Sequence, residues 1–388
     1  MALKPPYSFY EFFAGGGMAR AGLGGAWRCR LANDFDAGKA AVYAANYGDE
    51  TLKVGDIAKL TPADAPGRAD LVWASFPCQD LSLAGARGGL QGARSGAFFA
   101  FVRLLEGLAA DGRAPRLVGL ENVTGLLTSS NGADFSAVIE ALAPLGYQLT
   151  GHIIDAEAFT PQSRPRLFLT GALGGWDGAS TPRGDAEPAD PRLARAVAAL
   201  PPHLQASWRW VALPAPPRRN VSLIDVLEPS ASGLAWRTEE ETTRLLELMA
   251  PAHRQAVESR RAAGGRHVGT VFRRTRRENG RRVQRAEARF DGVAGCLRTP
   301  AGGSSRQLLL DIEAGAVRSR FLTGREAARL MGLPDDYQLP RAATAALHLL
   351  GDGVCAPAVG WLARTLFEPA LERLDAASPA DASLRGAA

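Results

Sequence analysis

The chain has 388 residues, of which 46% are hydrophobic, and it carries a formal net charge of +5 at pH 7. This apolar content suffices for a sizeable core, and the length suggests two domains. The four cysteines are far apart and form no CxxC pair, which argues against a disulfide framework and against a structural zinc site, so no metal is expected.

The first residues, "MALKPPYSFYEFFAGGG", lack the charged segment, apolar core and cleavage site of a signal peptide. No uninterrupted apolar run approaches the ~18–20 residues that a membrane span needs. The sequence therefore predicts a cytoplasmic protein that does not bind membranes.

The positive charge comes almost entirely from arginine, since only four of the 45 basic residues are lysines. Abundant Ala, Gly and Arg with little Lys is typical of a GC-rich genome. A pI near 9.2 also suits a polyanionic partner such as a nucleic acid. Composition alone leaves both explanations open.

Residues 8–171 alternate short apolar runs with helical patterns. Helices are expected in "DAGKAAVYAANY" and "DFSAVIEALAPLG". Strands are expected in "SFYEFFAG", "CRLAND", "DLVWASF", "RLVGLENV", "YQLTGHIIDA" and "RLFLTGA". Strands that alternate with helices predict an α/β fold with a doubly wound, mostly parallel sheet.

The pattern changes after this region. Residues 172–220 are rich in Pro, Gly and Ala, and "WVALPAPPRRN" resembles a linker. Residues 221–317 read as irregular and basic, with 12 Arg against three Glu between Arg254 and Arg289. Helical patterns return in "TGREAARLMGLP" and "APAVGWLARTLFEPALERL", and the low-complexity tail is expected to be disordered.

Three successive strand ends carry residues suited to an adenosine-containing cofactor. The first strand runs into Gly15–Gly17, where the backbone can turn tightly and approach a ligand, although a turn without a ligand is equally open. The second ends in Asp34, placed to accept hydrogen bonds from ribose hydroxyls, and in Phe35, which could cover a base. The third ends in Asp56 and Ile57, which could address an adenine edge.

The fourth strand ends in Pro77, Cys78 and Gln79. The thiol is either an inert, buried hydrophobe or a nucleophile at the carboxyl edge of the sheet. The fifth strand ends in Glu121 and Asn122, which could simply cap a helix.

The stretch "FTPQSRPRLFL" places Gln162, Arg164 and Arg166 directly before another strand. Arginines at alternate positions share one face of an extended chain, so the two guanidinium groups are expected to act together. A solvated pair on an edge strand is the alternative.

The order of these motifs resembles the DNA (cytosine-5)-methyltransferases. It runs through "FFAGGG", "NDFD", "GDI", "SFPCQDLS", "RSGAFF", "ENV" and "QSRPR", and after a variable region through "REAARLMGLPDDY" and "GDGVCAPAVGWLA". The resemblance covers about residues 8–171 and 289–366. It implies a Rossmann-like S-adenosylmethionine-dependent methyltransferase fold with a smaller, irregular target-recognition domain. The domains expected are 1–171 (cofactor binding and catalysis), 172–317 (target recognition and linker), 318–370 (return to the catalytic domain) and 371–388 (tail).

The resemblance also implies a covalent mechanism. Cytosine C5 is a poor nucleophile, and addition of the Cys78 thiolate to C6 turns the ring into an enamine-like species that attacks a methyl sulfonium. Glu121 would contact N3 and the exocyclic amine, Arg166 would hold O2, and Arg164 would support the pocket. The target base must be flipped out of the duplex, because a stacked base is unreachable.

Further contacts follow from the matched positions. The expected cofactor contacts are Phe13, Ala14, Gly15, Gly17, Asp34, Phe35, Asp56, Ile57, Pro77 and Asp352. The expected DNA contacts are Gln79, Ser82, Arg87, Arg94, Arg298, Ser304, Ser305 and Arg306. The glycine-rich segment "LSLAGARGGLQGARSG" is interpreted as a loop that closes over DNA and the flipped base, with an ordinary surface loop as the alternative.

Two positions depart from the family pattern. Asp352 stands where Asn is usual, near the cofactor's methionine carboxylate, so backbone N–H groups of this glycine-rich turn would have to bind that carboxylate. Glu11 stands where Asp is common. Neither position touches the methyl-transfer chemistry.

The resemblance implies double-stranded DNA as substrate, a monomer, and a bacterial, nucleoid-associated enzyme, and it leaves open a companion restriction endonuclease. An RNA enzyme with two cysteines is disfavoured because "GLENV" contains none. A tRNA cytosine-5 methyltransferase and a catalytically silent DNA-binding regulator are the remaining alternatives. The arginine-rich recognition region predicts a GC-rich target, because arginine pairs bidentately with guanine.

Overall fold

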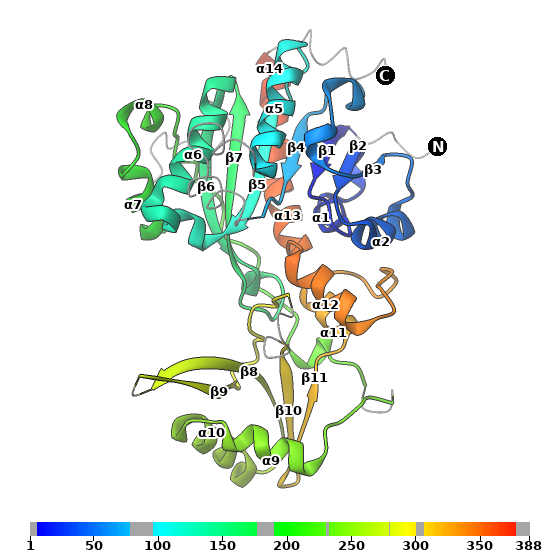
Figure 1. Ribbon diagram of the computed structural model, residues 1–388, viewed down its shortest axis with the longest axis vertical. Helices are drawn as coiled ribbons and strands as arrows, with labels where there is room; N and C mark the ends of the chain where they lie inside the picture. The colour runs from blue at the N-terminus through cyan, green and yellow to red at the C-terminus, as the bar shows by residue number, and fades with distance from the viewer. Residues whose placement is uncertain are drawn as a thin grey trace. The chain divides into compact units, whose positions relative to one another are not determined.

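The computed structural model describes residues 6–77, 96–176, 190–229, 233–278, 280–299 and 306–377. The chain forms two compact units (Figure 1). The first unit comprises Met1–Ile154, Pro165–Pro216 and Ala358–Ala388, and the second comprises Asp155–Arg164 and Pro217–Pro357. The domain boundaries expected from the motifs stay a prediction.

A seven-stranded sheet with the order β3-β2-β1-β4-β5-β7-β6 forms the centre of the first unit. Its strands are β1 (Tyr7–Phe12), β2 (Trp27–Asp34), β3 (Leu52–Val54), β4 (Leu71–Ala74), β5 (Leu117–Val123), β6 (Tyr147–Asp155) and β7 (Pro165–Leu173). The strands from β3 to β5 pair in parallel, whereas β7 runs antiparallel to β5. The predicted mostly parallel sheet is confirmed.

Helices cover both faces of this sheet, as a parallel sheet requires. They are α1 (Met18–Leu23), α2 (Ala37–Tyr47), α5 (Ala97–Ala110), α6 (Ala133–Leu142), α7 (Pro191–Ala198), α8 (Pro202–Gln205), α13 (Ala356–Leu362) and α14 (Glu368–Ala377), with a π-helical turn Ala363–Phe367 before α14. The linker predicted at 210–220 has no regular structure.

Aromatic contacts show which segments cover which face. Phe101 of α5 packs on Phe12 of β1, with ring centroids 5.6 Å apart. Trp73 of β4 aligns with Glu11, the residue before Phe12, so its side chain points to the opposite face. There it meets Phe367, at 6.4 Å between centroids. The C-terminal segment therefore completes the core of the first unit.

The second unit contains a four-stranded antiparallel sheet with the order β11-β10-β8-β9. Its strands are β8 (Arg266–Glu278), β9 (Arg281–Arg289), β10 (Leu308–Glu313) and β11 (Ala316–Phe321). Its helices are α9 (Glu239–Glu247), α10 (Pro251–Ala263), α11 (Gly324–Leu330) and α12 (Ala343–Asp352). The prediction that residues 221–317 are irregular is therefore wrong.

The basic composition hid these strands. Only a few inward positions of the β8–β9 hairpin are apolar and buried, among them Val271 and Ala286, which pack in a core with residues from α9, α10 and β10. The outward positions are charged, and ion pairs connect the two strands: Arg276 donates to Glu287 at 2.6 Å, and Arg285 pairs with Glu278. Cross-strand pairs of opposite charge stabilise a sheet without giving the apolar alternation that sequence reading looks for.

One stretch, Ala343–Ala376, is long and apolar enough to cross a membrane by length and composition alone. It runs from α12 to α14, and 72% of its most apolar window is buried inside the structure. That burial is typical of the core of a globular protein.

Candidate active site

The glycine-rich turn after β1 brings the backbone of β1 and β2 together. Phe13 has φ 56° and Gly15 has φ 55°, in the left-handed region that a bulky residue rarely adopts. The Ala14 N–H donates to the Asn33 carbonyl at 3.0 Å. A side chain at Gly17 would lie 2.5 Å from the Tyr47 ring. The turn therefore depends on its glycines and holds Phe13 in a strained conformation.

Asp34 ties this turn to the end of β2. Its buried carboxylate accepts the Gly15 N–H at 2.7 Å and the Asp36 N–H at 2.8 Å, one on each oxygen. Burial raises the pKa of the Asp34 carboxyl, while the two N–H groups act in the opposite direction. A carboxylate has about four acceptor positions. The acceptor positions of Asp34 that the Gly15 and Asp36 N–H groups do not use can accept hydrogen bonds from a pair of hydroxyl groups.

The ends of β2 and β3 each expose one apolar side chain. Phe35 is 79% exposed and Val54 is 54% exposed, and Val54 pairs in register with Asp34, the neighbour of Phe35. Asp56 follows on β3 and caps the next turn by accepting the Ala58 N–H, while Ile57 is buried. The sequence predicted Phe35 as a base cover; it gave Val54 no role.

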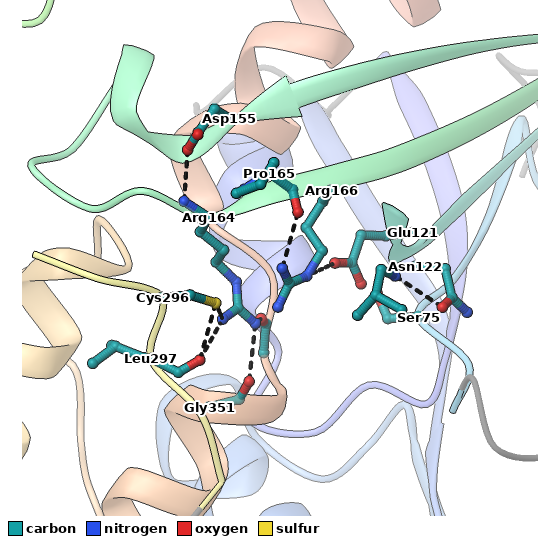
Figure 2. A network of polar contacts seen from close by, with 12 residues as sticks. Ser75, Glu121, Asn122, Asp155, Arg164, Pro165, Arg166, Cys296, Leu297 and Gly351 are labelled. Atoms are coloured by element: carbon teal, nitrogen blue, oxygen red, sulfur yellow. Dashed lines mark hydrogen bonds and ion pairs between the residues drawn. The ribbon is translucent and has the colours of Figure 1, made fainter. Parts of the chain in front are cut away.

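The antiparallel pairing of β7 with β5 places Arg166 beside Glu121. Arg166 is the second residue of β7 and is in register with Val123 at the end of β5. Its Nε lies 3.2 Å from Glu121 Oε1, and the two side chains are 14% and 7% exposed (Figure 2). A carboxylate and a guanidinium thus stand together in a largely buried position at the carboxyl end of β5, where they hold opposite charges in a fixed arrangement.

Asn122 holds the neighbouring strand end. Its Nδ2 donates to the Phe76 carbonyl at 3.0 Å, and its Oδ1 accepts the Val123 N–H at 2.8 Å. Phe76 precedes Pro77, which is exposed. The sequence showed Asn122 inside "ENV" but left open a simple helix cap; in the structure its amide contacts the segment that follows β4.

Several predicted residues lie outside the described part of the chain. They are Cys78, Gln79, Ser82, Arg87 and Arg94 in one segment, and Ser304 and Ser305 in another. Their roles stay predictions.

Arg164 and Arg166 have different partners. Arg164 belongs to the second unit and is 2% exposed, and its guanidinium donates to main-chain carbonyls of Leu297, Gly351 and Gly353 (Figure 2). Arg166 pairs instead with Glu121, and the shared face of the two arginines stays a prediction.

The predicted DNA-contacting and cofactor residues of the second unit are largely accessible. Arg298 and Asp352 are exposed, and Arg306 stacks on the Phe321 ring with its guanidinium carbon 4.2 Å from the centroid. The tip of the β8–β9 hairpin adds a group of exposed arginines that had been counted only as a dense cluster: Arg274, Arg276, Arg277, Arg281 and Arg282.

Glu11 is buried in β1 at 1% exposure. Burial raises the pKa of this carboxyl to about 8, although the backbone N–H and the positive charge of Arg20 act in the opposite direction. Nearby, Arg20 donates to the Tyr43 hydroxyl at 2.9 Å, and Tyr43 contacts the Cys29 thiol at 3.4 Å. A carboxyl group thus lies under the glycine-rich turn and favours its neutral form.

A seven-stranded, mostly parallel sheet with an antiparallel β7, and a glycine-rich turn and a carboxylate at neighbouring strand ends, fit the Rossmann-like methyltransferase fold. The family model for C-5 cytosine-specific DNA methylase matches residues 7–368. The chain belongs to this family, and it is a DNA (cytosine-5-)-methyltransferase whose methyl donor is S-adenosylmethionine.

Curated relatives carry the name Type II methyltransferase. The chain is 25% identical to M.HpaII of Haemophilus parainfluenzae, over 94% of this chain and 90% of that protein. It is 27% identical to M.NlaX of Neisseria lactamica, over 93% and 96%. The match to M.BsuFI of Bacillus subtilis reaches 36% identity but covers only 42% of this chain and 39% of that protein.

Solved structures with the same fold include the S. pombe Dnmt2 methyltransferase, with a TM-score of 0.57 and 18% identity over 95% of this chain and 99% of that chain. A DNMT2 mutant of Spodoptera frugiperda has a TM-score of 0.61 and 15% identity over 92% and 98%. At these identities the likeness establishes the fold alone.

Proposed function

We propose that this methyltransferase acts through a covalent adduct between Cys78 and C6 of a flipped-out cytosine in a specific double-stranded DNA sequence. The observation that carries the proposal is the Glu121–Arg166 pair, 3.2 Å apart at the carboxyl end of β5. Asn122 of the same strand end holds the carbonyl that precedes Pro77, and Cys78 is the next residue in the chain.

The chemistry follows from these residue types. The Cys78 thiolate forms a bond to C6, and the electron pair of the C5–C6 double bond becomes available at C5. C5 takes the methyl group from the sulfonium, whose S–CH3 bond breaks to leave a neutral thioether. A base then removes the C5 proton, the C5–C6 double bond re-forms, and the S–C6 bond breaks to release the thiolate. Glu121 stabilises the protonated N3, and Arg166 stabilises the charge that develops on O2.

The first unit fits the cofactor. When bound, S-adenosylmethionine supplies an activated methyl group. The Asp34 carboxylate accepts the ribose hydroxyls on its remaining acceptor positions, and Phe35 and Val54 cover the adenine. Asp56 and Ile57 contact the adenine edge, Pro77 borders the site, and Phe13 to Gly17 line it with backbone. In the second unit, the turn with Asp352 contributes at the methionine carboxylate.

The second unit and the segment after Pro77 bind DNA. Exposed arginines of the β8–β9 hairpin neutralise phosphates, which supplies affinity without sequence information. Arg298 and Arg306 read bases, Ser304 and Ser305 assist them, and Gln79, Ser82, Arg87 and Arg94 supply further DNA contacts. The arginine content favours a GC-rich target.

The cellular setting is part of the proposal. The names of M.HpaII and M.NlaX as Type II methyltransferases support a role in a restriction-modification system with a companion endonuclease. We place the enzyme in the bacterial cytoplasm, as a monomer associated with the nucleoid through DNA.

Covalent trapping tests the mechanism. A duplex with 5-fluorocytosine at the target position cannot lose its C5 substituent, so wild-type enzyme with S-adenosylmethionine should form an adduct that survives denaturing electrophoresis. Cys78→Ala should form none and still bind the duplex. Cys355→Ala, which removes another thiol that is buried, is the matched control and should be trapped. An adduct with Cys78→Ala would contradict the covalent mechanism.

A further inference from the structure

The Arg164 side chain occupies a cradle made of main-chain acceptors in the second unit. Its Nη1 donates to the Leu297 carbonyl at 2.9 Å and to the Cys296 sulfur at 3.4 Å. Its Nη2 donates to the carbonyls of Gly351 and Gly353 at 2.9 and 2.6 Å. Four hydrogen bonds from this guanidinium, which is 2% exposed, therefore join the segment at Leu297 to the turn Gly351–Gly353, more than fifty positions further along the chain.

The two segments also touch directly. A Cβ at Gly351 would lie 2.5 Å from the Thr299 nitrogen and 2.6 Å from the Arg298 carbonyl carbon. Real side chains essentially never approach this closely, so only glycine lets the turn Gly351–Gly353 rest on this backbone.

Gln162 fixes the same segment from the other side. Its Oε1 accepts the Leu297 N–H at 3.0 Å, and its Nε2 donates to the Leu330 carbonyl at 2.8 Å. The peptide groups on both sides of Leu297 are thus held, and the next residue is Arg298, whose side chain is exposed. An exposed arginine on a fixed backbone is suited to directional contacts, whereas a mobile one is suited to phosphates.

We infer that Arg164 is a positioning residue that couples DNA recognition to cofactor binding. It locks the segment that carries Arg298 to the turn that carries Asp352, so that ordering either segment by its ligand preorganises the other. Coupling of this kind is reciprocal, and each ligand tightens the binding of the other by the same factor. The inference rests on the proposed roles of Arg298 in DNA binding and of Asp352 in cofactor binding.

Lysine cannot replace this arginine. An ammonium group presents three donors from one point and cannot bridge carbonyls on two segments in the way a planar fork does. Arg164→Lys should therefore keep a positive charge in place and lose the link. Gly351→Ala should break the same contact from the opposite side, by pushing the turn away from Thr299.

The matched control is Arg113→Lys in the first unit. Arg113 likewise donates to three main-chain carbonyls, those of Pro62, Ala65 and Gly67, and it has no part in the proposed site. Arg113→Lys should lower the free energy of unfolding by about as much as Arg164→Lys does. It should leave the coupling between DNA binding and cofactor binding unchanged.

The experiment measures the Kd of a fluorescent target duplex by anisotropy, with and without saturating S-adenosylhomocysteine. The ratio of the two Kd values is the coupling factor, and we expect about tenfold for wild type and Arg113→Lys. Arg164→Lys should bring the ratio close to one while each ligand still binds alone. Gly351→Ala should also bring the ratio close to one, and it should raise the Kd of S-adenosylhomocysteine because it moves the turn that is proposed to bind the cofactor.

The outcomes separate the two proposals. A wild-type enzyme that binds neither duplex nor S-adenosylhomocysteine contradicts the proposed function itself. A wild type that binds both with a ratio near one overturns the inference. The inference is also overturned if either Arg164→Lys or Gly351→Ala keeps the wild-type ratio. The two substitutions act from opposite sides of one contact, so one variant that folds is enough for the test.

Discussion

Glu11→Gln isolates the effect of a buried carboxyl group on stability. The Glu11 side chain is 1% exposed, and burial raises its pKa from 4.5 to about 8. Between these two values the folded protein holds a proton that the unfolded chain releases. The free energy of unfolding therefore falls as pH rises through this window, by about 1.4 kcal/mol for each pH unit. Over the full interval from 4.5 to about 8, the contribution reaches about 5 kcal/mol at most.

Glutamine has nearly the same shape as glutamate and no titratable group. The free energy of unfolding of the variant therefore does not fall with rising pH through this group. Urea unfolding gives the free energy of unfolding of both proteins at pH 5 and pH 8. The value for the variant minus that for wild type should be larger at pH 8 than at pH 5 by up to about 4 kcal/mol. Glu106→Gln, on the exposed side of α5, is the matched control and should follow wild type at both pH values. Wild-type and Glu11→Gln stabilities that change in parallel with pH would refute the reasoning.

Further predictions concern the two ligands. Asp34→Ala should raise the KM for S-adenosylmethionine by a factor equivalent to about 1–3 kcal/mol, because hydrogen bonds to a buried charged acceptor are lost, and an unchanged KM in steady-state assays would remove the ribose assignment. Asn122→Ala leaves the Phe76 carbonyl without its donor and should lower kcat about tenfold with little change in either KM, which single-turnover methylation would check. Arg282→Gln should reduce the slope of log K against log salt by nearly one for all duplexes, whereas Arg298→Ala should relax specificity at one base pair.

The sheet of the first unit was predictable because burial on both faces leaves near-continuous apolar runs. The segment "DLVWASF" shows this, and β4 lies within it. The β8–β9 hairpin was not predictable in the same way. Its exposed half is built largely from charged residues. The pairs Arg276–Glu287 and Arg285–Glu278 reach diagonally across the strands, since the register places Val283 opposite Arg276 and Arg281 opposite Glu278.

The candidate site shows the same division. The order of motifs singled out Glu121 and Arg166 as separate contacts to the base, and that role stays a prediction. Their ion pair depends on β7 running antiparallel to β5, which the sequence did not indicate. Arg164 was paired with Arg166 because both precede one strand. The strand starts between them, at Pro165. No local sequence pattern predicts that Arg164 donates hydrogen bonds to backbone carbonyls far along the chain, such as that of Gly351.

The most direct test of the central claim is the identity and position of the methyl group. Purified enzyme is given S-adenosylmethionine with a methyl label and either duplex DNA or tRNA, and the nucleosides are then separated and analysed by mass spectrometry. We expect label only in 5-methyl-2′-deoxycytidine from duplex DNA, at one sequence by bisulfite mapping, and none with Cys78→Ala. Label in tRNA alone, label on another atom of a DNA base, or full activity of Cys78→Ala would contradict the account.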